Sequence, residues 1–300
     1  MGSMWKIEGT YTALVTPFAA DESIDARALD ALVEAQIQGG VAGLVPCGTT
    51  GESPSLSHAE QRDVVRRVVE VTAKRAQVIA GAGSNSTRDA VELARAAEKA
   101  GADAVMIVVP YYNKPTQDGL LRHFVTVAAS VSCPVVVYNI PGRTGVDLAA
   151  TTLERICEEA PNVVATKEAT GNVLRAQEIA RRLGDRVVVL SGDDALTLPM
   201  VSVGARGVIS VTSNVLPRHV ARATELALRG EGHGRKSAAL EAHLKLLPVH
   251  EAMFIEANPG PAKAALALRG AMRDTVRGPL VPVSEATRRA ITAALEPFSA

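Results

Sequence analysis

Aromatic residues and cysteines are both scarce in this chain of 300 residues. Phenylalanine, tyrosine and tryptophan together make up only 3% of it, so a tyrosine at the end of a strand is unlikely to be accidental filler. The three cysteines, Cys47, Cys133 and Cys157, are odd in number and widely spaced. This set gives neither a disulfide framework nor the paired C-x-x-C pattern of a zinc site, and it predicts a reducing, cytoplasmic location.

An excess of charge of either sign is also missing. The 32 basic residues balance the 32 acidic residues, so the chain has no net field that would hold nucleic acid or an anionic membrane surface. No apolar run approaches the roughly 18 residues that a membrane span requires. The start of the chain also lacks the pattern of a signal peptide. We therefore expect neither a nucleic-acid partner nor a membrane.

The sequence contains no motif for a nucleotide or a metal. There is no G-x-G-x-x-G fingerprint and no P-loop, and the six histidines show no H-E-x-x-H or other ligand spacing. We expect no cofactor and no catalytic metal.

What the chain does contain is a regular alternation of short β-branched apolar runs with longer segments of helical period. Eight strands are expected, at Tyr11–Thr16, Gly43–Pro46, Val78–Ala80, Ala104–Val108, Val135–Tyr138, Val163–Thr166, Val187–Leu190 and Gly207–Ser210. Eight regular units without a dinucleotide fingerprint favour a closed (β/α)₈ (TIM) barrel over a doubly wound sheet. The fold class is therefore α/β, with the barrel domain over residues 4–230.

Helices are expected between the strands and after the last of them. Ser57 followed by Glu60 forms a capping box, and Ser86 precedes another helix start. Residues 231–300 contain no strand-like run and are predicted to form a C-terminal helical subdomain. Its helices are expected near Gly234–Ala257, with a kink at Pro248, Gly260–Leu268 and Ser284–Leu295.

Polar residues gather where the expected strands end, which in such a barrel is the active-site face. Lys167 closes the apolar strand at 163–166, so its amine is expected over the dry barrel interior, where desolvation favours the neutral nucleophile of a Schiff base. The competing interpretation is a lysine that reaches solvent or pairs with Glu168. Tyr138 ends the neighbouring strand, where a phenol can relay protons. Its alternative role is packing.

Three further features concern substrate binding. The loop Gly48–Glu52 carries two hydroxyls between glycines and suits a small carboxylate, although it also suits a tight turn. Arg143 follows a rigid Ile140-Pro-Gly turn and is equally consistent with carboxylate recognition and with an ion pair at a surface or interface. Asp193 and Asp194 follow the seventh strand and argue against a phosphorylated substrate. We interpret Cys47 as a small buried residue, because no histidine is placed to activate it.

Six motifs in order carry a resemblance to a known family. They are GTTGES at Gly48, PYYN at Pro110, YNIPGRTG at Tyr138, KEATG at Lys167, SGDD at Ser191 and GVISVTSN at Gly207. From about Ile7 to its C-terminus, the chain resembles the dihydrodipicolinate synthases, which belong to the pyruvate-dependent class I aldolases. The resemblance implies an enzyme of diaminopimelate and lysine biosynthesis that condenses pyruvate with L-aspartate 4-semialdehyde through a lysine Schiff base.

The resemblance also implies a role for each residue that matches a motif. Lys167 would form the imine with pyruvate. The proton relay would consist of Tyr138, Thr49 and Tyr112, the last reaching in from a neighbouring subunit across the tight interface of a homotetramer built as a dimer of dimers. The substrate carboxylates would be bound through Thr50, with Gly192 and Ile209 lining the same pocket, and through Arg143 at its mouth.

Two departures from the family pattern concern regulation. In lysine-inhibited members, a site between subunits is lined by residues that align with Ser53, Pro54, His58, Gln61, Asn85, Asp89 and Tyr111. The sensitive bacterial type has a histidine where Gln61 stands and a glutamate where Asp89 stands. Feedback inhibition by lysine is therefore an open question for this chain.

Three other functions remain as alternatives. A sister lyase such as N-acetylneuraminate lyase or a 2-keto-3-deoxy sugar acid aldolase shares the lysine and the tyrosine, but the sialate enzyme has Ser then Thr in the first loop and lacks the arginine. A non-catalytic keto-acid sensor is disfavoured by the presence of both Lys167 and Tyr138. The acidic loop after the seventh strand disfavours a phosphate-handling barrel enzyme.

Overall fold

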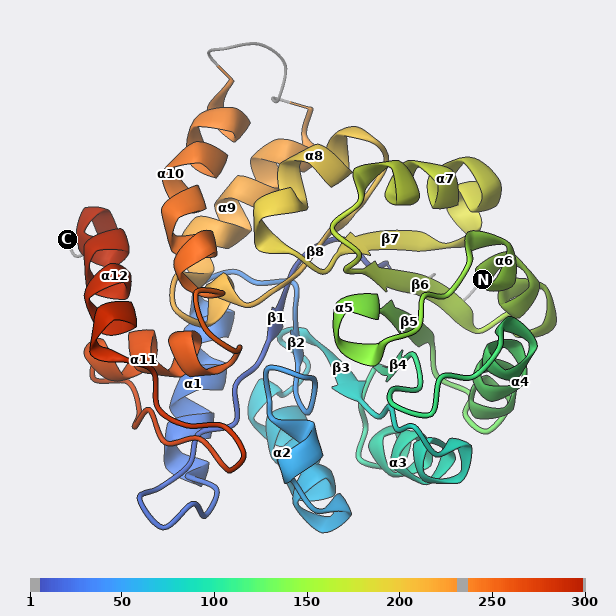
Figure 1. Cartoon of the computed structure of the whole chain (residues 1–300), viewed down its shortest axis with the longest axis horizontal. Coiled ribbons are helices and arrows are strands. Elements are labelled where there is room, and N and C mark those ends of the chain that lie inside the picture. Colours follow the sequence, from blue (N-terminus) through green and yellow to red (C-terminus); the bar gives the residue numbers. More distant parts are fainter. Residues whose placement is uncertain (1–5, 231–236, 299–300) are drawn as a thin grey trace.

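A computed structural model of the chain describes residues 6–230 and 237–298, and it forms a closed parallel barrel surrounded by helices (Figure 1). Each strand pairs in parallel with its neighbour in the sequence, and the first strand pairs with the last. This confirms the predicted barrel. Its strands are β1 Gly9–Ala13, β2 Gly43–Val45, β3 Gln77–Gly81, β4 Ala104–Val108, β5 Val135–Asn139, β6 Val163–Glu168, β7 Val188–Ser191 and β8 Gly207–Ser210.

Helices follow the strands and cover the outside of the barrel. Those of the barrel are α1 Ala26–Gln38, α2 His58–Thr72, α3 Thr87–Lys99, α4 Gln117–Ala128, α5 Pro141–Thr144, α6 Ala150–Glu159, α7 Val173–Leu183, α8 Thr197–Ser202 and α9 Pro217–Leu228. The capping box at Ser57 is confirmed, because its hydroxyl accepts from the Glu60 amide and the Glu60 carboxylate accepts from the Ser57 amide. The Ser86 hydroxyl caps α3 by accepting a hydrogen bond from the Asp89 amide.

The first strand begins and ends earlier than expected. It was predicted over Tyr11–Thr16, but the chain leaves the ladder after Leu14, whose amide is still bonded to the Val45 carbonyl. The next polar groups have partners outside the sheet. The Val15 amide donates to the Asn214 side chain, and the Thr16 hydroxyl donates to the Gly51 carbonyl. Acceptors outside the sheet, one a side chain and one a backbone carbonyl, therefore end the strand, which an alternation pattern does not reveal.

The core has two layers, one on each side of the barrel wall. Side chains that point outward, such as Leu44 and Val137, pack beneath the surrounding helices. Side chains that point inward fill the barrel itself and include Tyr11, Met106 and Ile209. Because a strand alternates its side chains between the two faces, every strand contributes to both layers. The barrel is therefore a packed support for the loops at its rim.

Three helices after the barrel form a C-terminal extension along one side of it (Figure 1, orange to red). They are α10 Ala238–Ala252, α11 Gly260–Leu268 and α12 Glu285–Leu295, and α10 packs on α9. Pro248 lies inside α10. That helix was expected to reach residue 257, but it ends at Ala252. The expected helix start at Gly234 lies within residues 231–236, which are outside the described part of the chain, and the expected domain boundary after residue 230 adjoins them. The expected domain start at residue 4 is also outside the described residues.

We expect that Gly81→Ala destabilises the protein. A methyl group on Gly81 would overlap the carbonyl group of Cys47, so β3 and the loop after β2 would have to separate. Overpacking of this kind costs about 1–3 kcal/mol. The matched control is Gly142→Ala, because a methyl group at residue 142 meets nothing within 4 Å. Urea unfolding midpoints measure the effect, and equal midpoints for the two variants would contradict the close approach.

Candidate active site

Lys167 and Tyr138 form the centre of the candidate site. They are paired residues on the neighbouring strands β6 and β5. The Lys167 ammonium nitrogen, Nζ, lies 4.2 Å from the centre of the Tyr138 ring. Only 5% of Lys167 and 4% of Tyr138 are exposed. The two residues that the sequence selected as nucleophile and proton relay therefore lie together in a nearly dry environment.

Glu168 does not serve as the partner of Lys167. It follows Lys167 in the strand, so the two side chains leave opposite faces of the sheet. Its carboxylate accepts from the Arg175 guanidinium at 3.3 Å, from the Asn139 amide at 3.4 Å and from the Thr170 backbone amide at 3.0 Å. These bonds satisfy the buried charge of Glu168 away from Lys167. The interpretation of Lys167 as one half of a structural ion pair with Glu168 is therefore disfavoured.

The loop between β2 and α2 has an unusual backbone. Cys47 and Glu52 both have positive φ angles, 55° and 53°, in a region that residues with a side chain rarely adopt. Between them lie Thr49, which is partly exposed, and Thr50, which is buried. The Thr50 hydroxyl accepts a hydrogen bond from the Asn258 side-chain amide at 3.0 Å. The loop is therefore held in one defined conformation, with Thr49 at its accessible edge.

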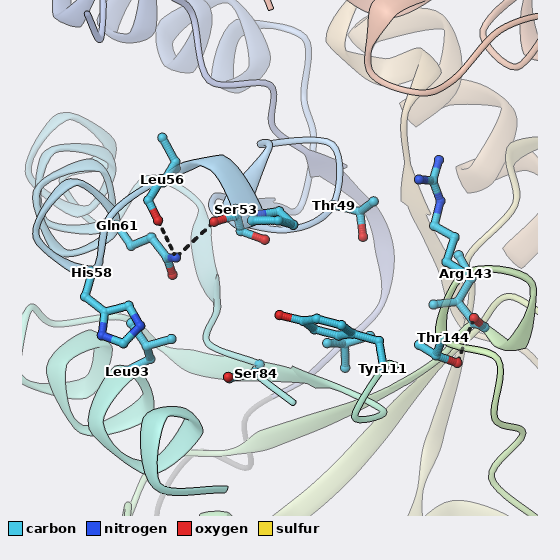
Figure 2. A pocket seen from close by; sticks show the side chains of 14 residues that line it. Thr49, Ser53, Leu56, His58, Gln61, Ser84, Leu93, Tyr111, Arg143 and Thr144 are labelled. Carbon is cyan, nitrogen blue, oxygen red and sulfur yellow. Dashed lines mark hydrogen bonds between the residues drawn. The ribbon is translucent and has the colours of Figure 1, made fainter. Parts of the chain in front are cut away.

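A cleft of about 340 Å³ opens beside this loop. Thr49 and Arg143 line one part of it, and Figure 2 shows the Tyr111 ring between them and the side occupied by His58 and Gln61. The Gln61 amide nitrogen is not free, because it donates to the backbone carbonyls of Ser53 and Leu56. Five of the residues that the resemblance implies for a lysine site line this cleft: Ser53, Pro54, His58, Gln61 and Tyr111.

Arg143 lies at the rim of the site, on the short helix α5. That helix begins with Pro141 directly after Ile140, so the predicted rigid turn is a single helical turn. The Arg143 side chain is exposed, and one of its terminal nitrogens lies 3.5 Å from the Asn258 carbonyl oxygen. In Figure 2 its guanidinium extends away from Thr144. The group is therefore accessible to an anionic ligand.

Gly192 and Ile209 lie on the same side of the barrel as Lys167. Gly192 directly follows β7, and its amide donates to the Glu168 carbonyl at 2.8 Å. A Cβ atom at Gly192 would be 2.5 Å from the Cβ of Ala169, so only glycine fits there without movement. Ile209 is fully buried on β8, within the inward-facing layer that also contains Tyr138.

The chain does not bring Tyr112 to this site, and the cleft lined by Thr49 is not lined by Lys167 or Tyr138. Its side chain is 88% exposed and its φ angle is +73°. It is not among the residues that line the cleft, although the preceding residue, Tyr111, is. Within a single chain, the predicted relay is therefore incomplete.

The acidic loop after β7 occupies the position where barrel enzymes bind phosphate. The buried Asp194 carboxylate accepts from the backbone amides of Val211 and Thr212, at 2.8 and 3.2 Å, and from the Ser210 hydroxyl. Burial raises the pKa of the neighbouring Asp193. The amides that would bind an anion are thus taken by a carboxylate of the chain itself, which agrees with the expectation of an unphosphorylated substrate.

Within residues 6–230 and 237–298, no three His, Cys, Asp or Glu side chains come together as metal ligands. None of the helices in the described segments combines the length and the apolar character that crossing a bilayer requires.

Comparison with known proteins agrees with this geometry. A model of the dihydrodipicolinate synthetase family matches residues 6–297. A protein of Sorangium cellulosum named 4-hydroxy-tetrahydrodipicolinate synthase is 60% identical over 99% of this chain and 98% of that protein. The synthase structure from Methylacidiphilum fumariolicum SolV is 46% identical and superposes with a TM-score of 0.92 over 97% of this chain and 95% of that one.

The structure of the chloride-inhibited synthase of Acinetobacter baumannii, which contains pyruvate, is 40% identical. It superposes with a TM-score of 0.94 over 97% of this chain and 98% of that one.

The chain belongs to the dihydrodipicolinate synthetase family. The comparisons confirm the predicted activity, that of a 4-hydroxy-tetrahydrodipicolinate synthase of lysine and diaminopimelate biosynthesis. They also confirm the predicted class, a lyase of the class I aldolase type.

Analysis of the sequence missed the contribution of the C-terminal extension to this dihydrodipicolinate synthetase site. Asn258, Lys263 and Arg277 all contact the loop between β2 and α2. One signal was available for Lys263, because it is the only charged residue in the helical segment Gly260–Leu268. A lone lysine in an apolar helix is seldom buried unless it is paired.

We expect Cys47 to be unreactive in the folded protein. Burial raises the pKa of its thiol to about 12, so the nucleophilic thiolate is scarce at neutral pH. Iodoacetamide at pH 8 should leave Cys47 unmodified and the activity unchanged, whereas the urea-unfolded chain should be alkylated. Peptide mass mapping measures both states. Rapid alkylation of folded protein at Cys47 with loss of activity would instead support a cysteine nucleophile.

Proposed function

We propose that this chain condenses pyruvate with L-aspartate 4-semialdehyde through an imine on Lys167. The observation that carries the proposal is the buried pair of Lys167 and Tyr138 on adjacent strands. A lysine that is shielded from water and packed against a tyrosine is placed to act as an amine nucleophile. Pyruvate is the compound bound in the related Acinetobacter baumannii enzyme.

The reaction follows from this arrangement in four steps. The Lys167 amine attacks the keto carbon of pyruvate, and loss of water from the carbinolamine leaves an imine. The methyl group of the imine then loses a proton, which produces an enamine. The enamine carbon attacks the aldehyde of the second substrate and forms the new carbon–carbon bond. Finally, the amine of that substrate displaces Lys167 and closes the ring.

Proton transfer in these steps is assigned to Tyr138, Thr49 and Tyr112. The Tyr138 ring packs against the reacting amine of Lys167. Its phenol is therefore suited to exchange protons with the carbinolamine and the enamine. Thr49 lines the open cleft and would connect that phenol with a second tyrosine.

Two groups are assigned to the substrate carboxylates. Thr50 and the backbone of its loop bind pyruvate, with Gly192 and Ile209 as the walls of the same pocket. Arg143, which is exposed at the rim, binds the carboxylate of the semialdehyde and orients its aldehyde. The reaction needs one amine, a proton relay and two anion sites, so these residues account for it without a metal or a cofactor.

Tyr112 is proposed to act in a neighbouring subunit of a homotetramer built as a dimer of dimers. A tyrosine that is 88% exposed on a positive-φ backbone projects from the chain, which favours a partner surface over packing within the chain. A monomeric variant of a dihydrodipicolinate synthase, 39% identical to this chain, is also known. The oligomeric state therefore has to be tested directly.

We place the enzyme in the cytoplasm. The support for this location is the state of the cysteines, since Cys47, Cys133 and Cys157 are all free thiols.

Replacement of Lys167 tests the proposed nucleophile. Lys167→Ala should lower kcat by at least about 10³-fold, as the loss of a covalent nucleophile does in other enzymes. The assay combines pyruvate and aspartate 4-semialdehyde with a coupled reductase that oxidises a nicotinamide cofactor. Lys99→Ala, which changes an exposed lysine at the end of α3, is the control and should retain full activity.

Borohydride trapping separates the alternatives. Reduction in the presence of pyruvate should add one pyruvate-derived group to Lys167, measured by peptide mass. Trapping without ring formation would indicate a sister lyase with another aldehyde, and the absence of trapping would favour the keto-acid sensor.

Mixing two variant chains tests whether Tyr112 acts in a neighbouring subunit. Lys167→Ala and Tyr112→Phe are each expected to be impaired, but co-expression of the two should restore activity. In a mixed dimer, the site with an intact Lys167 receives an intact Tyr112 from the other chain. If Tyr112 serves its own subunit, mixing restores nothing, and a light-scattering mass equal to one chain would also contradict the shared site.

A further inference from the structure

A buried ionic cluster links the C-terminal extension to the loop that carries Thr49 and Thr50. Glu52, the last residue of that loop, is 3% exposed, and one oxygen of its carboxylate lies 2.5 Å from Nζ of Lys263 on α11. The other oxygen accepts a hydrogen bond from the Arg277 backbone amide at 3.0 Å. Both carboxylate oxygens of Glu52 are therefore held by the extension.

Lys263 is enclosed on all sides by the chain. It is 0% exposed, and besides Glu52 it contacts the Thr275 carbonyl oxygen at 2.9 Å and the face of the Phe18 ring at 4.0 Å. Desolvation by burial lowers the pKa of Lys263 to about 8, and the Glu52 carboxylate opposes that shift. These contacts hold the ammonium in one position.

Arg277 completes the cluster from the segment between α11 and α12. Its guanidinium also lies over the Phe18 ring, 4.5 Å from the ring centre. It also donates to the Ser55 carbonyl at 2.9 Å and pairs with Glu60 at the start of α2. The side-chain bond to Arg277 lowers the pKa of Glu60 to about 2. The extension thus contacts the turn that leads from the loop into α2 at Glu52, Ser55 and Glu60.

The loop needs such external support because its conformation is strained. Positive φ angles at Cys47 and Glu52 are unfavourable for residues with a side chain and persist only where the surroundings enforce them. At the Cys47 end, Gly81 allows the close approach of β3. At the Glu52 end, the enforcing contacts come from the extension, together with the Asn258 amide that binds the Thr50 hydroxyl.

Stability alone is a poor explanation for this cluster. A buried ion pair often contributes no more to stability than apolar residues of the same volume would, because both charges lose their hydration. What such a pair does provide is a fixed geometry. The geometry fixed here is that of Glu52, two residues after Thr50.

We propose that Lys263 and Arg277 are positioning residues for the reaction, because they hold Glu52 and thereby fix the Thr49–Thr50 loop in the shape that binds the pyruvate carboxylate. The inference rests on the proposed function, in which Thr50 binds that carboxylate and Thr49 relays protons. Neither Lys263 nor Arg277 touches substrate. The C-terminal extension is then a part of the active site, although none of its side chains takes part in the chemistry.

The test is the double variant Glu52→Gln with Lys263→Met in the full chain. The two changes remove both charges together, so no unpaired charge is left in the interior. The unfolding midpoint should stay close to that of the unchanged protein. The KM for pyruvate should rise about tenfold, with a smaller fall in kcat and little change in the KM for the semialdehyde.

The matched control is Arg182→Met, which removes the contacts of Arg182 with Glu154 and Glu178 on α6 and α7, away from the loop. It should leave both KM values unchanged. A folded double variant with an unchanged KM for pyruvate, or one whose two KM values rise equally, would overturn the positioning role.

A second variant keeps the test decisive if the double variant does not fold. Arg277→Met removes the guanidinium contacts at the edge of the cluster and leaves the buried pair of Glu52 and Lys263 in place. It should raise the KM for pyruvate selectively, by a smaller factor, and an unchanged value would overturn the inference. Borohydride trapping on Lys167 is measured in every variant, so that a failure of the proposed Schiff-base mechanism is recognised separately.

Discussion

The whole architecture depends on the hydrogen-bonded closure between the first and the last strand. Gly9 on β1 and Gly207 on β8 are paired residues, and a methyl group on Gly207 would overlap the Gly9 carbonyl. Gly207 also has a φ angle of +154°, which glycine adopts far more readily than other residues. Because every neighbouring pair of strands is parallel, all eight carboxyl ends lie on the same side, and the closure arranges them around one rim. Lys167, Tyr138 and the loop that follows β2 lie at the carboxyl ends of their strands, at this rim.

The alternation of side chains along β6 places Lys167 and Glu168 on opposite faces of the strand. Lys167 faces the Tyr138 ring, whereas the next residue, Glu168, is bonded to Arg175 and Asn139 on the other side. The backbone between them is shared, so the fixed carboxylate restrains the strand from which the amine projects. In the loop after β7, the Asp194 carboxylate likewise accepts from the backbone amides of the next loop.

The sequence predicted those parts of the molecule that local pattern determines. The eight strands, the capping box at Ser57 and the placement of Lys167 beside Tyr138 all follow from short-range periodicity and from the rule that neighbouring strands pair. The early end of β1 was not predictable in this way, because its cause is the side chain of Asn214 in a distant loop. The contacts of Lys263 and Arg277 were missed for the same reason. Tyr112 is a different case, because the described part of the chain leaves its side chain exposed and offers it no contact from which a role could be read.

The long separation between partners in the loop contacts has a consequence for the order of events during synthesis. Thr50 and Asn258 are 208 residues apart in the chain, and Glu52 and Arg277 are 225 apart. The loop is therefore synthesised early, but its contacts with Asn258 and Arg277 can form only when nearly all of the polypeptide has been made. Contacts of such high sequence separation form late, since their loop-closure entropy is spent before they stabilise anything. On the proposed positioning role, a nascent chain that has already assembled its barrel would bind pyruvate more weakly until the last helices are made.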